Sequence, residues 1–557
     1  MKNLMINIKG RVVLTILMMI VISCDDYLDV TPKESVSDVT LWADKGNAEL
    51  FLNGIYGSIR GPVAYLYDFF DPQDNFTDNS LCNYTWGSSR TVYNPGIETP
   101  NTLSSLKQWE QQFTNIRKCN VFISNIEASD LDEDWKKLRL AEARFLRAYF
   151  YSLLWTSYGG VPIITEALNR FTQGDEIFHE RATDDETYQF IVDECAAIAN
   201  DLPSKPGKSR VGKGAALALK GWCELFHASP LKNSGNEKAR WASAAATYKQ
   251  VMDMNVYSLF PDHETLNYEA NNNNVEIIFD KTYLGGTSIG SCRGGMQPIC
   301  FVGGTQVSWA SVNPTQELID EYAMANGLPI TDPASGYDPQ NPYVNREKRF
   351  YDDIIYDGST WLGYEAVYWT GSGSLNELDL DFLSSGRPVT VYHPRKAIEA
   401  QYCVNGKNYL GSASWIIFRY AEVLLSYAEA QNEAVGPDAS VYEAVNMVRA
   451  RVDLPPLRAS MSQEEMRTAI YRERRVEFCF EDKRWYDLIR LKLAGEKLSQ
   501  PVHTMKITKV DGKKVYTVVP TGGDRAFDPA KNYLLPIPQS AIDRNEELVQ
   551  NPGYGNN

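Results

Sequence analysis

The sequence lacks the usual metal-binding and redox motifs. Its nine cysteines include no Cys-x-x-Cys pair and its five histidines include no His-x-x-x-His pair, the spacings typical of zinc and thiol redox sites. We therefore expect no cofactor, although acidic loops such as Asp352-Asp353 permit calcium without specifying it. It also has no long block of lysine and arginine, so we expect no nucleic acid partner, because phosphate binding needs clustered positive charge.

Convincing catalytic motifs are missing as well. Residues 286–290 match the Gly-x-Ser-x-Gly pattern around Ser288, but Gly294-Gly295 follows where that motif needs a helix. Residues 207–209, Gly-Lys-Ser, lack the earlier glycine of a phosphate-binding loop, since position 202 is leucine. A glycoside hydrolase needs two placed carboxylates, and nothing singles out a pair among 71 acids. We expect no catalytic residue, with a surface glycoside hydrolase as the less favoured alternative.

The N-terminal segment, residues 1–23, is expected to be a signal peptide. Positive charges precede an apolar run of eleven residues, 12–22, which is too short to span about 30 Å of hydrocarbon. Residues 21–24, Val-Ile-Ser-Cys, resemble the lipobox of bacterial lipoproteins, which implies cleavage before Cys24 and a lipid attached to it. An ordinary secretory signal is the alternative. Removing residues 1–23, with three positive and no negative charges, changes the formal charge from −16 to −19. No later apolar run approaches the roughly 18 residues of a membrane span.

The rest of the chain is mostly helical in pattern. Apolar side chains recur at steps of three and four over residues 136–157, and Thr183 followed by Glu186 forms a capping box at the start of the next helix. Small residues in shared register suit closely packed helix pairs. The pattern predicts a mainly α fold of four tetratricopeptide-like helix pairs, which are 44–58 with 103–126, 136–157 with 183–202, 214–228 with 238–254, and 415–434 with 439–451.

The stretch 257–412 interrupts this helical pattern. It contains paired glycines and a β-rich run at 275–279, and one helix is predicted from Asn313-Pro314 to Gly327. Its density of tyrosine and tryptophan argues against disorder. Elsewhere, four cysteines beside aliphatic residues are expected to be buried thiols: Cys119, Cys195, Cys223 and Cys479. Cys292 and Cys300 could form a disulfide.

Several motifs are spread over the chain after Cys24. They are Asp-Tyr-Leu-Asp at 26–29, Pro-Thr-Gln-Glu-Leu-Ile-Asp at 314–320, Tyr-Arg-Glu-Arg-Arg-Val-Glu-Phe at 471–478, Lys-Arg-Trp-Tyr-Asp-Leu-Ile-Arg at 483–490, Tyr-Leu-Leu-Pro-Ile-Pro at 533–538 and Gln-Asn-Pro-Gly-Tyr at 550–554. Together these motifs resemble one family, the SusD/RagB outer-membrane lipoproteins of Bacteroidota. The resemblance covers essentially the whole chain after Cys24.

The resemblance implies one SusD-like domain, 24–557, comprising an N-terminal part, 24–220, a non-repeat insertion, 257–412, and a C-terminal part, 280–557. It implies four tetratricopeptide-like units with a loop-rich ligand-binding face containing small β elements. It further implies a non-catalytic lipoprotein on the outer surface of the outer membrane, which captures an oligosaccharide or polysaccharide for a SusC-like TonB-dependent transporter. A peptide ligand is the alternative, as is a repeat scaffold that binds only proteins.

The basic motif residues also have a structural interpretation. Arg474, Arg475 and Glu477, followed by Arg484 to Asp487, are expected to form a buried network of ion pairs and stacked rings, since arginine pairs bidentately and stacks on aromatic faces.

Ligand residues are expected on aromatic loops, because sugar rings offer apolar faces rimmed by hydroxyls. Two regions meet this requirement, and in SusD-like proteins the ligand aromatics come from the same two locations. The first gives Asn83, Tyr84, Trp86 and Arg90. The second, the non-repeat insertion, gives Tyr283, Trp361 and Trp369, of which Trp361 also suits a core position. Trp86 is the strongest single candidate.

Overall fold

The computed structural model describes residues 38–59, 72–84, 87–102, 106–284, 301–302, 305–306, 311–369, 389–402 and 411–555. Cys24, Trp86, Ser288, Cys292 and Cys300 therefore lie outside the described residues.

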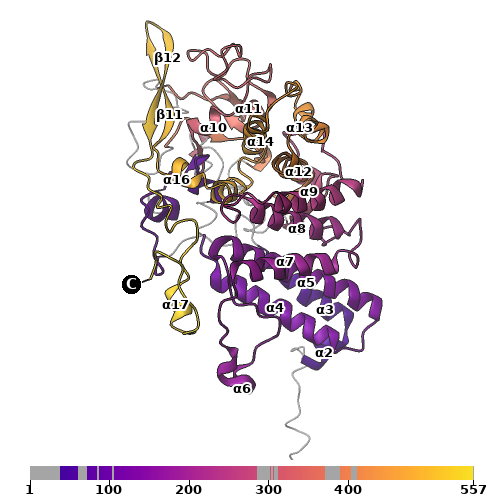
Figure 1. Cartoon of the computed structure of the whole chain (residues 1–557). Coiled ribbons are helices and arrows are strands. Elements are labelled where there is room, and N and C mark those ends of the chain that lie inside the picture. Colours follow the sequence, from indigo (N-terminus) through magenta and orange to yellow (C-terminus); the bar gives the residue numbers. More distant parts are fainter. Residues whose placement is uncertain are drawn as a thin grey trace, which may run out of the picture.

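A stack of antiparallel helices forms the body of the molecule (Figure 1), and each helix packs against the next along the chain. The predicted mainly α fold with four tetratricopeptide-like pairs is confirmed. The helices of the stack are α2 (Asp38–Ala43), α3 (Lys45–Gly57), α4 (Trp109–Glu127), α5 (Glu133–Tyr158), α7 (Asp184–Ile198), α8 (Lys213–Ala228), α9 (Lys238–Asp253), α12 (Tyr420–Val435) and α13 (Ala439–Arg451).

Local signals set the ends of these helices. The Asp132 side chain caps α5 by accepting a hydrogen bond from the Trp135 backbone N–H, and Gly159, with φ 76°, ends it in a conformation that favours glycine. The predicted capping box of Thr183 and Glu186 is present at the start of α7. The small residues at the shared register are all buried between helices, as expected: Ala141, Ala148, Ala421 and Ala428.

Long-range pairing overrides two of the predicted helices. Residues 415–419 form strand β10 (Trp415–Arg419) instead of a first helical turn, because this buried β-branched and aromatic run pairs antiparallel with β2 (Ile277–Lys281). The predicted helix from Asn313 to Gly327 is reduced to α10 (Gln316–Ile319). It stops early because the backbone carbonyls of Ile319 and Tyr322 accept hydrogen bonds from the Arg346 guanidinium, at 2.5 and 2.7 Å.

A second core lies outside the stack, where the non-repeat segment packs against C-terminal residues. It contains α10, α11 (Lys348–Asp353), and a long hairpin of β11 (Val502–Val510) and β12 (Lys513–Thr521) that projects at the end of the molecule opposite α2 (Figure 1). The non-repeat segment also contains short antiparallel pairs: β3 (Phe301–Val302) with β4 (Thr305–Gln306), β6 (Ile354–Ile355) with β9 (His393–Pro394), and β7 (Thr360–Trp361) with β8 (Tyr364–Glu365).

Two further helices join the stack to the non-repeat segment. They are α14 (Gln463–Glu477) and α15 (Arg484–Arg490), which carry the basic motifs; the remaining short helices are α6 (Arg170–Gln173), α16 (Ala494–Lys497) and α17 (Gln539–Ile542). The predicted buried thiols Cys119, Cys195, Cys223 and Cys479 are buried, and so is Cys82. No helix in the described ranges combines the length and the apolar character that a membrane span requires.

Candidate ligand-binding face

The two regions predicted to bind ligand are joined by a short ladder. Strand β1 (Ser80–Leu81) pairs antiparallel with β5 (Asn313–Pro314), placing Leu81 opposite Asn313. Two hydrogen bonds extend the junction: Asn75 Nδ2 donates to the Ser311 carbonyl at 3.0 Å, and the Thr315 backbone N–H donates to the Asn79 carbonyl at 2.9 Å. The chain that leads into the 82–90 loop is therefore fixed directly to the non-repeat segment.

A buried carboxylate holds this junction on the C-terminal helices. Asp78 is 2% exposed, and Arg484 donates to both of its oxygens at 2.8 Å, while Arg475 lies 3.1 Å from Oδ2. Burial alone would raise the pKa of Asp78, but the two guanidinium groups outweigh it and hold that pKa well below the usual range of a carboxyl. Asp78 is therefore a charged clamp between the loop and helices α14 and α15.

The clamp belongs to the network that the sequence predicts. Arg474 and Arg490 lie 3.2 and 2.8 Å from Asp487 Oδ1, with all three residues buried. Trp485 packs edge-on against Phe76 and Tyr93 at centroid separations of 6.5 and 5.9 Å. The structural interpretation of these motifs is confirmed.

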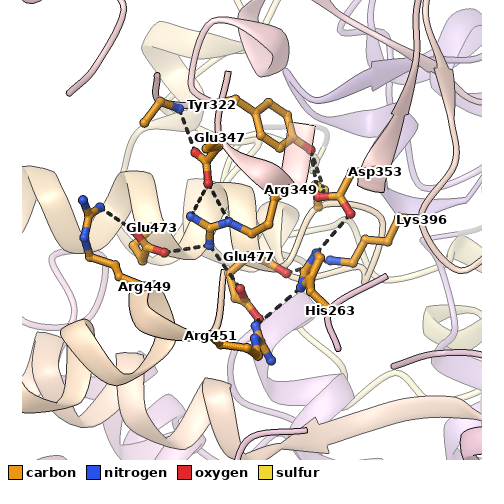
Figure 2. A network of polar contacts seen from close by, with 12 residues as sticks. His263, Tyr322, Glu347, Arg349, Asp353, Lys396, Arg449, Arg451, Glu473 and Glu477 are labelled. Atoms are coloured by element: carbon orange, nitrogen blue, oxygen red, sulfur yellow. Dashed lines mark hydrogen bonds and ion pairs between the residues drawn. The ribbon is translucent and has the colours of Figure 1, made fainter. Parts of the chain in front are cut away.

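A second buried network, which also includes side chains of α14, reaches into the non-repeat segment (Figure 2). Glu477 forms ion pairs with three guanidinium groups: that of Arg349 at 3.1 Å, that of Arg419 at 2.6 Å, and that of Arg451. Arg349 also reaches Glu473 at 2.6 Å. These buried pairs cross between α14, α11, β10 and α13, so they fix the non-repeat face relative to the helical stack.

The first predicted region lies directly after β1. Asn83 is buried, Tyr84 is half-buried, and Arg90 lies in a short π-helical turn, η2 (Ser89–Tyr93). Arg90 Nη1 donates to the Cys82 carbonyl at 2.9 Å, so its guanidinium closes the loop on itself. Trp86, the strongest candidate from the sequence, lies outside the described residues.

In the second region, Tyr283 follows strand β2 and is half-buried against the main helical core. The Lys281 ammonium lies 5.5 Å from its ring centroid and donates to the carbonyls of Gly57 and Ile59. Burial lowers the pKa of Lys281. This lysine therefore ties the start of the Tyr283 segment to the end of α3.

The structure distinguishes the two candidate tryptophans of the insertion. Trp361 is 8% exposed and belongs to the second core, with the Arg395 guanidinium 6.0 Å from its ring centroid. Trp369 is half-buried at the edge of that core, and the Lys509 ammonium lies 4.0 Å from its ring centroid. A ligand that reaches Trp369 therefore meets a positive charge as well as an indole ring.

The sequence did not single out Lys509, or a small, partly open aromatic cavity. The cavity, of about 100 Å³, lies between α5, α8, β10 and α15, and its walls include Tyr149, Trp222, Trp415 and Tyr486. An engineered cavity of about 150 Å³ admits benzene, so this smaller space suits water rather than a sugar ring. No short-range pattern marks either feature, since both depend on contacts between distant segments.

The acids at 352–353 have partners within the protein. Asp352 accepts from Lys348 at 2.6 Å, and Asp353 lies 3.1 Å from both His263 Nε2 and the Tyr322 hydroxyl. Within the described part of the chain, no cluster of three or more histidine, cysteine or acidic side chains is arranged to hold a metal. The oxygens that the sequence offered for calcium are thus engaged in hydrogen bonds.

Two family models match this chain. The model of the SusD family matches residues 275–554, and a model described as "Starch-binding associating with outer membrane" matches residues 26–221. The chain belongs to the SusD family. It is 25% identical to SusD-like protein P2 of Formosa agariphila over 574 residues, which cover 98% of this chain and all of that protein.

Solved SusD-like structures agree with the fold. A SusD-like protein from Bacteroides fragilis superposes with a TM-score of 0.79 at 28% identity, covering 93% of this chain and 99% of that one. A second B. fragilis protein, described as SusD-like and carbohydrate-binding, has a TM-score of 0.75 at 26% identity and covers 92% of this chain and 100% of that one. In this SusD-family chain, the arginine motifs of α14 and α15 are the part that fixes the candidate face to the helical stack.

Proposed function

We propose that this protein is a non-catalytic glycan-binding lipoprotein that captures oligosaccharide or polysaccharide at the cell surface. The observation that carries the proposal is the β1–β5 ladder, which pairs the chain just before the 82–90 loop with residues 313–314 of the non-repeat segment in a SusD-family fold. Membership of the family alone gives the fold. The joined loops give a place where one extended ligand can contact both regions.

The relatives point to the same class of ligand. One similar B. fragilis structure is described as a carbohydrate-binding protein, and another SusD-like neighbour is described as laminarin-binding. The family model over residues 26–221 is described as starch-binding and associated with the outer membrane. These descriptions support a glycan over the peptide ligand that the sequence left open.

The side chains of the face suit sugar recognition. An aromatic ring stacks on the apolar face of a pyranose, while amide and guanidinium groups serve its hydroxyl rim. Tyr84, Trp86 and Tyr283 are our proposed platforms, with Asn83 and Arg90 as polar neighbours. We propose that such a site binds its ligand without chemistry.

We further propose that the lipid on Cys24 holds the protein on the outer face of the outer membrane, where it delivers the glycan to a SusC-like TonB-dependent transporter. In this arrangement the residues after Cys24 form the tether. The anchor is tested by a Cys24→Ala variant, which should be lost from the membrane fraction of cells; unchanged membrane recovery would contradict it.

Substitution of Trp86 tests the ligand face. After a glycan array has identified a bound oligosaccharide, Trp86→Ala should weaken its affinity by about 1 kcal/mol or more, because a stacking platform is lost. Phe171→Ala is the matched control, since Phe171 is a fully exposed aromatic on α6, outside both regions. Titration calorimetry measures both, and an affinity unchanged in a folded Trp86→Ala variant would remove Trp86 from the site.

A further inference from the structure

The β11–β12 hairpin carries a net positive charge, whereas the chain as a whole is negatively charged. Between Ser499 and Gly523 there are four lysines and a single acid, in a protein with a formal charge of −16. The lysines are Lys506, Lys509, Lys513 and Lys514. An acidic protein that gathers positive charge on one projecting element presents a surface suited to a negatively charged partner.

The base of the hairpin lies against the start of the 82–90 loop. Val502 forms a small buried cluster with Leu81 and Val389. Gly522, just after β12, approaches Leu81 so closely that an added Cβ would lie 2.5 Å from its Cδ1. The hairpin therefore starts at the proposed glycan face and is continuous with it.

The hairpin is also rigidly held. Thr521 Oγ1 donates to the Val389 carbonyl at 2.7 Å, and the Val391 backbone N–H donates to Thr504 Oγ1 at 3.1 Å. On the outer edge of β12, the Gln340 side chain pairs with the backbone N–H and carbonyl of Tyr516, at 3.2 and 3.1 Å. Side chains on the hairpin are thus presented in fixed positions.

Two of the four lysines face each other across the strands. Lys509 stands directly opposite Lys514, an arrangement of like charges that costs stability. Asp357 compensates one of them, because its Oδ2 accepts from Lys514 at 2.5 Å while its Oδ1 accepts from the Tyr368 backbone N–H at 2.9 Å. Lys509 makes no ion pair with any residue that the structure describes, and its ammonium is placed over the Trp369 ring.

We propose that Lys509, seated on Trp369, forms a subsite for an anionic group of the glycan, either the carboxylate of a uronic acid or a sulfate ester. This inference rests on the proposed glycan-binding function and narrows its ligand class to acidic polysaccharides. The indole ring fixes the position of the ammonium, which lowers the entropy lost when an anion binds. The repulsion between Lys509 and Lys514 lowers the stability of the fold. Binding of the anionic group gives this pair of like charges a function.

Affinity electrophoresis at low salt tests the proposal with three immobilised glycans. Polygalacturonate carries carboxylates, carrageenan carries sulfates, and galactan carries neither. The wild type should be retarded more by one of the acidic glycans than by galactan, and which one it is separates the carboxylate from the sulfate. Lys509→Gln should lower the affinity for that glycan about fivefold or more, and Lys509→Arg should retain it.

Lys506→Gln is the matched control, since Lys506 is an exposed lysine on the same strand that points to the opposite side of the pleat. It should change the affinity less than twofold. Equal losses for Lys506→Gln and Lys509→Gln would overturn the subsite and indicate a general attraction of charges. Retardation of the wild type by galactan alone would overturn the acidic ligand class and leave the proposed function standing. Failure to bind any glycan, in this test and on a glycan array, would overturn both.

Discussion

Among single residues, Asp78 does most to connect the candidate face to the rest of the molecule. It lies between two arginines from α14 and α15, and it immediately precedes the chain that forms β1 and the 82–90 loop. A buried carboxylate of this kind is tolerated only while its charge is matched. The arginine motifs of the C-terminal third therefore act on the ligand face through one side chain near the N-terminus.

Asp78→Asn should lower the free energy of unfolding by about 3–5 kcal/mol, because it leaves buried guanidinium groups without their counter-charge. Urea denaturation at pH 7 measures this loss. Asp201→Asn is the control, since Asp201 pairs with Lys137 at 3.0 Å on the surface, where an ion pair is worth at most about 1 kcal/mol. Equal effects of the two substitutions would contradict the clamp.

Asp74 is also a buried acid, but its pKa is raised, whereas the pKa of Asp78 is lowered. Burial, followed by the nearby charge of Asp482, raises its pKa from 3.8 to about 7. The folded protein therefore keeps a proton on Asp74 that the unfolded chain releases near pH 4, so this group should lower stability as the pH rises from about 4 to 7.

Asp74→Asn, which mimics the protonated form, should remove that dependence. We expect the variant to gain stability relative to the wild type by about 2–3 kcal/mol between pH 5 and pH 8. Urea denaturation of both proteins at the two pH values gives the difference, in which all other titrating groups cancel. A difference that stays constant with pH would show that Asp74 is charged in the folded protein.

At the scale of elements, a close approach at a glycine links the hairpin to strand β1. Gly522 and Gly523 have the same φ, 82°, but an added Cβ would meet Leu81 only at position 522 and would meet no atom within 4 Å at position 523. Alanine substitutions at the two glycines therefore share the cost of backbone strain, but only the substitution at position 522 adds overpacking against Leu81.

Gly522→Ala should destabilise the protein by about 1–3 kcal/mol more than Gly523→Ala, because the extra methyl group must displace a buried leucine. It should also weaken glycan binding, since Leu81 precedes the 82–90 loop. Thermal unfolding together with calorimetric titration measures both effects. Equal behaviour of the two variants would mean that the hairpin base does not support the loop.

Local signals made most of the helical stack predictable from the sequence. The capping box at Thr183 and the apolar spacing over residues 136–157 depend only on neighbours along the chain. Strand β10 was mispredicted as helix because its partner, β2, lies some 140 residues earlier. The aromatic residues of the face could be proposed by type, but the contact of Lys509 with Trp369 could not, because it joins residues 140 positions apart.

At the scale of the whole molecule, the helical stack and the non-repeat segment act as scaffold and face. Buried arginines of both parts converge on Glu477 (Figure 2), so the face keeps a fixed position on the stack. A fixed, loop-rich face is suited to capturing a ligand rather than to chemistry that requires closure around a substrate. This arrangement supports the proposal of a binding protein.

The most direct test is calorimetric titration of the purified mature protein with a panel of neutral and acidic oligosaccharides, followed by chromatography of each mixture. The account predicts heat of binding for at least one oligosaccharide, with every sugar chain recovered at its original length. Shortened products would contradict the non-catalytic function, and the absence of binding to every glycan would contradict the proposed ligand class.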